Sequence, residues 1–142
     1  MIPKADWKWY GNAAHFICGQ WCRFHLATKV GRVVVSTIGE YVHPRNSKGS
    51  ERAETEWLSE NPLGENVGAG RKFETMVFPT RGDKCECGCG LPTVVYKYDL
   101  DFMGHDTRED ATKGHMEMCE RWADEVRQGK AIHEAFERGG VI

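Results

Sequence analysis

Cysteine and histidine side chains stand at short spacings in three parts of this chain, and they are the residue types that bind transition metals. Cys85, Cys87 and Cys89 alternate with single residues in a glycine-rich segment that has little to bury. Glycine lets the chain bend tightly, and zinc gains folding energy from four tetrahedral thiolate or imidazole ligands. We therefore expect a structural zinc ion bound by at least two of these cysteines, and free thiols are the competing interpretation.

His115 and Cys119 form a second pair of potential ligands. They are four residues apart in a segment that predicts a helix, so their side chains fall on one helix face. Two loop cysteines and this pair would complete a tetrahedral site, and His105, just before the helix, is an alternative fourth ligand. His115 and Cys119 also lie on the apolar side of the predicted helix, where core packing is the competing interpretation.

A third cluster has gaps of three, four and three residues and consists of His15, Cys18, Cys22 and His25. The residues around the last two predict a strand, and side chains three apart on a strand point to opposite faces. Joint metal binding would need a bulge or a helical segment there. We therefore expect packing and hydrogen bonding at these positions in preference to metal binding.

Four side chains could perform general acid–base chemistry, namely Arg23, His25, Glu40 and Glu74. Arg23 and His25 project from the same face of a predicted strand, and the two glutamates could approach them across a sheet. A polar sheet edge whose groups satisfy one another is the competing interpretation. The chain has no Gly-rich phosphate loop, nucleophile elbow or metalloprotease helix, so no motif identifies a reaction.

Aromatic residues and charges are unevenly distributed along the chain. Residues 1–50 carry seven Lys and Arg against two Asp and Glu, whereas residues 51–142 carry twelve against nineteen. Trp7, Trp9 and Tyr10 lie in the basic part, and Trp57 lies in a polar stretch. Because Trp and Tyr are favoured at interface hot spots, these four are candidate partner-binding residues. A nucleic acid is the alternative partner, whose bases the rings would stack on.

The elements that must position these residues are strands first and helices last. Trp21–Thr28 and Val33–Ile38 flank a Gly-containing turn, and the second run is β-branched, which predicts a β-hairpin. Two further runs predict strands, Phe73–Phe78, which we expect to stop at Pro79, and Thr93–Tyr98.

A helix is predicted to begin at Asp106 or Thr107, either of which can act as its N-cap. Apolar positions then recur at helical spacing, namely Ala111, His115, Met118, Cys119, Trp122 and Val126. A shorter helix over Lys130–Arg138 follows Gly129. This order predicts an α+β fold, in which a small antiparallel sheet of hairpins packs against the C-terminal helices and zinc stabilises the whole.

Length and composition predict one domain over residues 1–142, with a polar loop at about 43–72. The sequence lacks the apolar run of a signal peptide and any stretch long enough to span a bilayer, so we expect a cytoplasmic protein with no membrane partner. In that reducing compartment the six cysteines are expected to be metal ligands or core thiols in preference to disulfides.

The residues Arg23, Ser36–Thr37 and Glu74 resemble the motifs of ADP-ribosyltransferases, although those families place a longer connection between their first two motifs. The resemblance implies a small enzyme that uses Arg23, His25 and Glu74. A metal-dependent hydrolase is the other enzyme class considered for the same residues.

A second resemblance covers most of the chain. Five segments are similar to a family of uncharacterised small proteins encoded by phages and prophages: residues 15–17 (HFI), 22–26 (CRFHL), 35–41 (VSTIGEY), 74–78 (ETMVF) and 87–92 (CGCGLP). Members of that family are longer between the regions of Tyr41 and Phe73. The resemblance implies an accessory protein in the host cytoplasm that binds a host protein or nucleoprotein complex. An anti-CRISPR-like inhibitor of host defence is one such protein.

Overall fold

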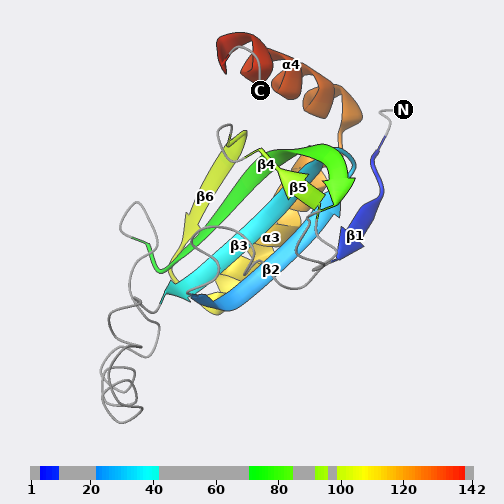
Figure 1. Ribbon diagram of the computed structural model, residues 1–142. Helices are drawn as coiled ribbons and strands as arrows, with labels where there is room; N and C mark the ends of the chain where they lie inside the picture. The colour runs from blue at the N-terminus through cyan, green and yellow to red at the C-terminus, as the bar shows by residue number, and fades with distance from the viewer. Residues whose placement is uncertain (1–3, 10–21, 42–70, 85–91, 96–98, 140–142) are drawn as a thin grey trace.

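The structure, a computed structural model, describes residues 4–9, 22–41, 71–84, 92–95 and 99–139. In chain order they form β1 (Trp7–Trp9), β2 (Cys22–Val30), β3 (Val33–Tyr41), β4 (Phe73–Lys84), β5 (Pro92–Val94), β6 (Asp101–His105), α3 (Arg108–Trp122) and α4 (Glu125–Gly139). The strands form an antiparallel sheet in the order β1-β2-β3-β4, and β5 and β6 both pair with β4. Figure 1 shows α3 behind the sheet, with β1 and β6 at its two edges. The predicted α+β class is confirmed.

The predicted hairpin is confirmed, and both of its strands are longer than expected. Val30 pairs with Val33 across the two-residue turn Gly31–Arg32. Gly31 has a φ of +59°, which glycine adopts at little cost, and a Cβ atom there would lie 2.7 Å from the Cβ atom of Ala5. This tight turn fixes the register of β2 against β3, and the register decides which side chains share a face.

The strand β4 is longer than predicted because it does not stop at Pro79. Pro79 pairs with Val33 in the ladder to β3, and the next N–H group, that of Thr80, donates to the carbonyl oxygen of Arg32 at 3.0 Å. The N–H that proline lacks would point to the other edge of β4, away from β3. There the pairing with β6 ends at Val77 and the pairing with β5 begins at Thr80. No ladder donor is needed at that junction, so the expected stop was wrong.

Two strands were not predicted as such. The residues Trp7–Trp9 pair with β2, and β6 pairs with the first half of β4. Asp and Gly are depleted in strands, so β6 has little intrinsic strand propensity and forms because β4 offers it a partner. β5 covers the start of the run predicted at Thr93–Tyr98, and residues 96–98 lie outside the described part.

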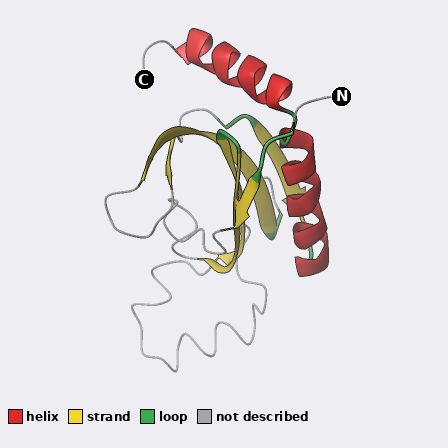
Figure 2. Cartoon of the chain, turned by 90° about the vertical axis from the view of Figure 1, so that its right-hand side faces the viewer, coloured by secondary structure: helices red, strands yellow, loops and turns green. Residues whose placement is uncertain are grey.

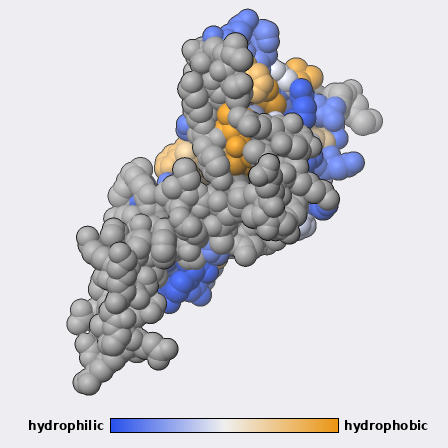
Figure 3. Space-filling model, in the orientation of Figure 1, coloured by the Kyte–Doolittle hydropathy of each residue, from blue (hydrophilic) through white to orange (hydrophobic). Residues whose placement is uncertain are grey.

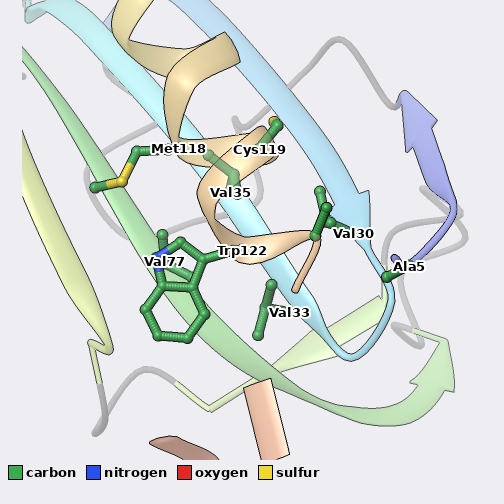
Figure 4. Close-up of a cluster of buried hydrophobic side chains, with 9 residues drawn as sticks. Ala5, Val30, Val33, Val35, Val77, Met118, Cys119 and Trp122 are labelled. Atoms are coloured by element: carbon green, nitrogen blue, oxygen red, sulfur yellow. The ribbon is translucent and has the colours of Figure 1, made fainter. Parts of the chain in front are cut away.

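The helix α3 begins where the sequence predicts. Thr107 is the N-cap, and its side chain accepts a hydrogen bond from the N–H group of Asp110 at 3.1 Å. Five positions of the predicted apolar stripe are buried, namely Ala111, His115, Met118, Cys119 and Trp122. Figure 4 shows the last three among valines of the sheet, in the larger of the apolar clusters described. α3 therefore covers one face of the sheet.

The helix α4 is longer than predicted and begins at Glu125. Asp124 precedes it, and its Oδ1 atom accepts hydrogen bonds from the N–H groups of Val126 and Arg127, at 2.9 and 3.1 Å. This cap separates the two helices, so Val126, predicted on the stripe of the first helix, is 65% exposed. Gly129, expected in front of the second helix, lies inside it.

Gln128 attaches α4 to the sheet. Its side chain accepts a hydrogen bond from the N–H group of Arg32 at 2.9 Å and donates to the carbonyl oxygens of Val30 and Trp122, at 2.9 and 2.5 Å. Figure 2 shows the result, with α3 lying along the sheet and α4 crossing its end. Neither of the two described helices is long and apolar enough to cross a membrane.

The sheet face away from α3 has an apolar cluster of its own, made by Ala27, Val34, Ile38, Phe78 and Val94.

The predicted polar loop at about 43–72 lies outside the described residues, except for Arg71 and Lys72.

Candidate functional site

The strand register places three of the four candidate acid–base residues on the face away from α3. Arg23 and His25 alternate along β2 with residues that face α3, and Glu74 does so along β4. His25 pairs with Ile38, and Ile38 pairs with Glu74, so these three side chains form one row across the sheet. Burial raises the pKa of the Glu74 carboxyl, which is only 8% exposed. A buried carboxyl with a raised pKa is one feature of general acids and bases, so Glu74 stays a candidate for that role.

Glu40, the fourth candidate, is engaged in a structural contact. It ends the regular part of β3 with a φ of +56°, and its side chain is fully buried. The guanidinium of Arg23 approaches its carboxylate at 3.0 Å, and Arg108, the first residue of α3, donates to both of its oxygens. Two guanidinium groups on one carboxylate fix β2, β3 and the start of α3 together. Glu40 therefore fits the role of a charged clamp better than that of a catalytic base.

A chain of hydroxyl and imidazole groups lies buried between α3 and the sheet. His115 of α3 bonds through Nε2 to the Thr28 hydroxyl at 2.8 Å and through Nδ1 to the Thr37 hydroxyl at 2.7 Å. The Thr37 hydroxyl bonds to that of Thr75 at 2.6 Å, and Thr75 bonds to Nε2 of His105 at 2.9 Å. All five side chains are buried. We call this set the hydroxyl–imidazole chain.

Both histidines of this chain are neutral near pH 7. Burial lowers the pKa of His115 to about 4, and the neighbouring His105 adds to the decrease. Burial also lowers the pKa of His105. Sequence reasoning missed the chain because each threonine alone looks like an ordinary strand residue. The available signal was one threonine in each of β2, β3 and β4, at a position on the otherwise apolar face that the helix covers.

The helical pair proposed as metal ligands belongs to this buried layer. Both ring nitrogens of His115 already have hydroxyl partners, and Cys119 is a fully buried residue of the main core. Burial raises the pKa of the Cys119 thiol to about 11, although a hydrogen bond with Thr28 acts in the opposite direction. A metal ligand must be a thiolate, so this environment disfavours Cys119 as a ligand. The Nε2 atom of His105 is likewise engaged, in a hydrogen bond with the Thr75 hydroxyl.

No group of three or more potential metal ligands occurs within residues 4–9, 22–41, 71–84, 92–95 and 99–139. The cysteines on which the zinc prediction depends, Cys85, Cys87 and Cys89, lie outside those ranges, as do His15 and Cys18. Zinc binding by the three cysteines therefore stays a prediction from the sequence.

The candidate partner-binding tryptophans of β1 have different environments. Trp7 is half-buried and packs against the main core. Trp9 is 51% exposed, and its indole stacks on the ring of His115, with 5.7 Å between centroids and 29° between planes. Tyr10 and Trp57 lie outside the described residues. Trp9 is thus a large aromatic side chain that rests on the buried layer and also meets solvent.

A pocket of about 460 Å³ lies between the end of α3, the start of β6 and α4. Leu100, Trp122 and Ala131 supply its apolar part, and five charged side chains line the rest. In Figure 3, hydrophobic surface is visible in the upper part of the molecule, with hydrophilic surface to its right. Sequence reasoning did not predict this pocket, because its residues come from three segments whose packing the sequence does not reveal.

Asp101 lines the pocket, and its carboxylate is paired with neighbouring side chains. Asp101 accepts hydrogen bonds from Arg121 at 2.8 Å and from the indole N–H of Trp122 at 2.9 Å. Burial acts to raise the pKa of Asp101, but the hydrogen bonds from Trp122 and Arg121 outweigh it and hold the pKa below its ordinary value. The Arg127 guanidinium lies 6.0 Å from the centroid of the Trp122 ring, in a cation–π contact.

Comparison with known proteins gives no family, because no family model, no curated protein and no solved structure matches this chain.

Proposed function

We propose that this protein acts by binding a macromolecular partner, with Trp9 as the anchor of the contact. The observation that carries the proposal is the position of the indole, half exposed and stacked on a histidine whose two ring nitrogens are held by threonines. A side chain fixed in this way loses little conformational entropy on binding. Trp is also among the residue types enriched at interface hot spots.

The charges near this surface favour a protein partner over a nucleic acid. Trp9 lies on the face of the sheet that α3 covers, so a partner at Trp9 also approaches the helices. Residues 108–139, which include both helices, carry six Lys and Arg against eight Asp and Glu. A net charge of −2 over these residues gives a phosphate backbone no electrostatic advantage at the helices, whereas protein interfaces tolerate mixed charge.

The wider context of the proposal comes from the sequence. The resemblance to phage proteins implies a partner in the host cytoplasm, either a host protein or a nucleoprotein complex, including components of host defence. Zinc bound by Cys85, Cys87 and Cys89 would stabilise the protein and take no part in the contact.

The test is affinity capture from the lysate of a bacterial host with three proteins: wild type, Trp9→Ala and Phe102→Ala. Phe102 is a matched control, since it is 41% exposed and lies on β6, at the other edge of the sheet. Wild type and Phe102→Ala should retain the same host protein. Trp9→Ala should recover at least about tenfold less of it. Thermal unfolding of Trp9→Ala checks that the fold is intact.

Two outcomes would contradict this function. Equal recovery by Trp9→Ala and wild type would remove Trp9 as the anchor. Captured material that nuclease treatment or moderate salt releases would assign the protein to nucleic-acid binding instead, because such binding weakens steeply with salt.

A second candidate function is catalysis at the opposite face of the sheet. The observation that favours it is the row of His25 and Glu74 on either side of Ile38, with burial raising the pKa of Glu74. Incubation with labelled NAD and host lysate tests the ADP-ribosyl-transfer version. A transferred label that Glu74→Gln abolishes would support it, and no transfer above background would reject it.

A further inference from the structure

The pocket between α3, β6 and α4 carries positive charge that the described residues do not neutralise. Arg121, one of its three cations, is paired with Asp101 at 2.8 Å. Arg127 and Lys130 form no ion pair with a carboxylate in the part of the chain that the structure describes. Both project from the first half of α4 into the lining of the pocket. An unpaired Arg and Lys beside one another attract an anion.

The volume and the apolar side chains of this open pocket leave room for more than an inorganic ion. Its volume, about 460 Å³, falls in the range of small-molecule sites. Leu100 and Ala131 line it with aliphatic groups, and Trp122, which is 3% exposed, contributes only an edge. A base or another flat ring therefore has no open aromatic face to stack on, whereas a short aliphatic or branched group fits the apolar part.

The negative groups of the pocket select the kind of anion. Asp101 and Glu134 also line it, and Asp101 is ionised and already paired. A phosphate dianion would be repelled by these carboxylates about twice as strongly as a carboxylate monoanion. The Arg127 guanidinium is held over the indole ring, so its N–H groups can form the two parallel hydrogen bonds that match a carboxylate.

We propose that this pocket binds a carboxylate that carries an apolar group, with Arg127 and Lys130 holding the charge and Leu100 and Ala131 contacting the apolar part. Such a ligand is either a small aliphatic acid or the C-terminal carboxylate of a peptide that ends in an aliphatic residue. Trp9 does not line this pocket, so a test of carboxylate binding does not depend on the proposed function.

The experiment is a titration of the full chain with hexanoate, with a peptide ending in leucine as free acid and as amide, and with inorganic phosphate. Binding is followed by calorimetry and by the NMR signal of the Trp122 indole N–H, which points to Asp101 at the pocket. Hexanoate or the free-acid peptide should shift that signal, and the tighter of the two identifies the source of the carboxylate. The amide and phosphate should bind at least about tenfold more weakly.

The variants Arg127→Gln and Lys130→Gln should each weaken binding of the carboxylate about tenfold. Lys113→Gln is the matched control, because Lys113 is an exposed cation of α3 that does not line the pocket. All three residues are exposed, so the substitutions should leave the fold intact. The proposal is overturned if no carboxylate shifts the signal, if phosphate or the amide binds as tightly, or if both pocket variants bind as wild type does.

Discussion

His115 has hydroxyl partners on both ring nitrogens, and this fact decides which chemistry the residue can perform. From its position on an apolar helix face, metal binding and core packing were competing interpretations of this residue. In the fold, the ring joins Thr28 of β2 to Thr37 of β3 and so connects α3 to two strands. Such a buried polar contact specifies how the helix sits on the sheet, because any other placement would leave these groups unsatisfied.

The protein should lose stability in mild acid because of this histidine. The folded protein keeps His115 neutral down to a pKa of about 4, whereas the unfolded chain protonates it below about pH 6.5. The contribution to the free energy of unfolding is therefore complete above about pH 6.5 and is lost as the pH falls towards 4. By about pH 5 the loss from this residue should reach about 2 kcal/mol. Denaturant unfolding at the two pH values measures it.

The matched comparison is His115→Gln against His133→Gln, since His133 is 72% exposed on α4, where it pairs with Glu137. We expect the difference in unfolding free energy between about pH 7 and about pH 5 to shrink by about 2 kcal/mol in His115→Gln and to stay unchanged in His133→Gln. If both variants keep the acid sensitivity of wild type, the loss arises elsewhere and His115 is not its cause.

At the scale of elements, α3 approaches the sheet closely because glycine stands at position 114. An added Cβ atom there would lie 2.0 Å from the Cε1 atom of the His105 ring, which Thr75 holds in place. In α4, the Cβ atom of an alanine at position 129 would lie 3.2 Å from the Nη2 atom of Arg32, the far end of a flexible side chain. A side chain at position 114 would therefore disturb the packing of α3, whereas position 129 has room for one.

Gly114→Ala should destabilise the protein by about 2 kcal/mol or more, because a buried ring must move and its hydrogen bond is disturbed. Gly129→Ala should be neutral or stabilise by up to about 1 kcal/mol, since alanine favours the helical backbone. Thermal unfolding of the two variants beside wild type measures the difference. Similar midpoints for both variants would mean that α3 does not pack against His105 as closely as described.

The sequence predicted elements best where local signals and tertiary contacts agree. The β2–β3 hairpin and the start of α3 were confirmed because Gly31 and Thr107 each favour locally what the fold requires. The passage of β4 through Pro79 and the formation of β6 depend on pairing between distant segments, and propensity does not contain that information. The pocket was missed for the same reason, since Leu100, Trp122 and Lys130 come together only through packing.

At the scale of the whole molecule, the described polar residues fall into two groups with different roles. The hydroxyl–imidazole chain and the Glu40 clamp face inward and join α3 to the sheet. Trp9 and the cations of α4 face outward, on separate parts of the surface. The cations of α4 can therefore be tested without disturbing the inner residues, whereas Trp9 contacts His115 and substitutions at these two positions should be coupled.

Zinc binding belongs to this scale because it would connect a segment outside the described residues to the rest of the protein. Purified protein should contain about one zinc ion per chain if Cys85, Cys87 and Cys89 bind it as their spacing predicts. Elemental analysis should show the zinc content reduced to background in the double variant Cys87→Ser and Cys89→Ser. Cys119→Ser should keep it, because burial raises the pKa of that thiol to about 11 and a neutral thiol is a poor ligand. Zinc-free wild-type protein with an unchanged fold would contradict the prediction, and loss of zinc in Cys119→Ser alone would return the helical pair to the site.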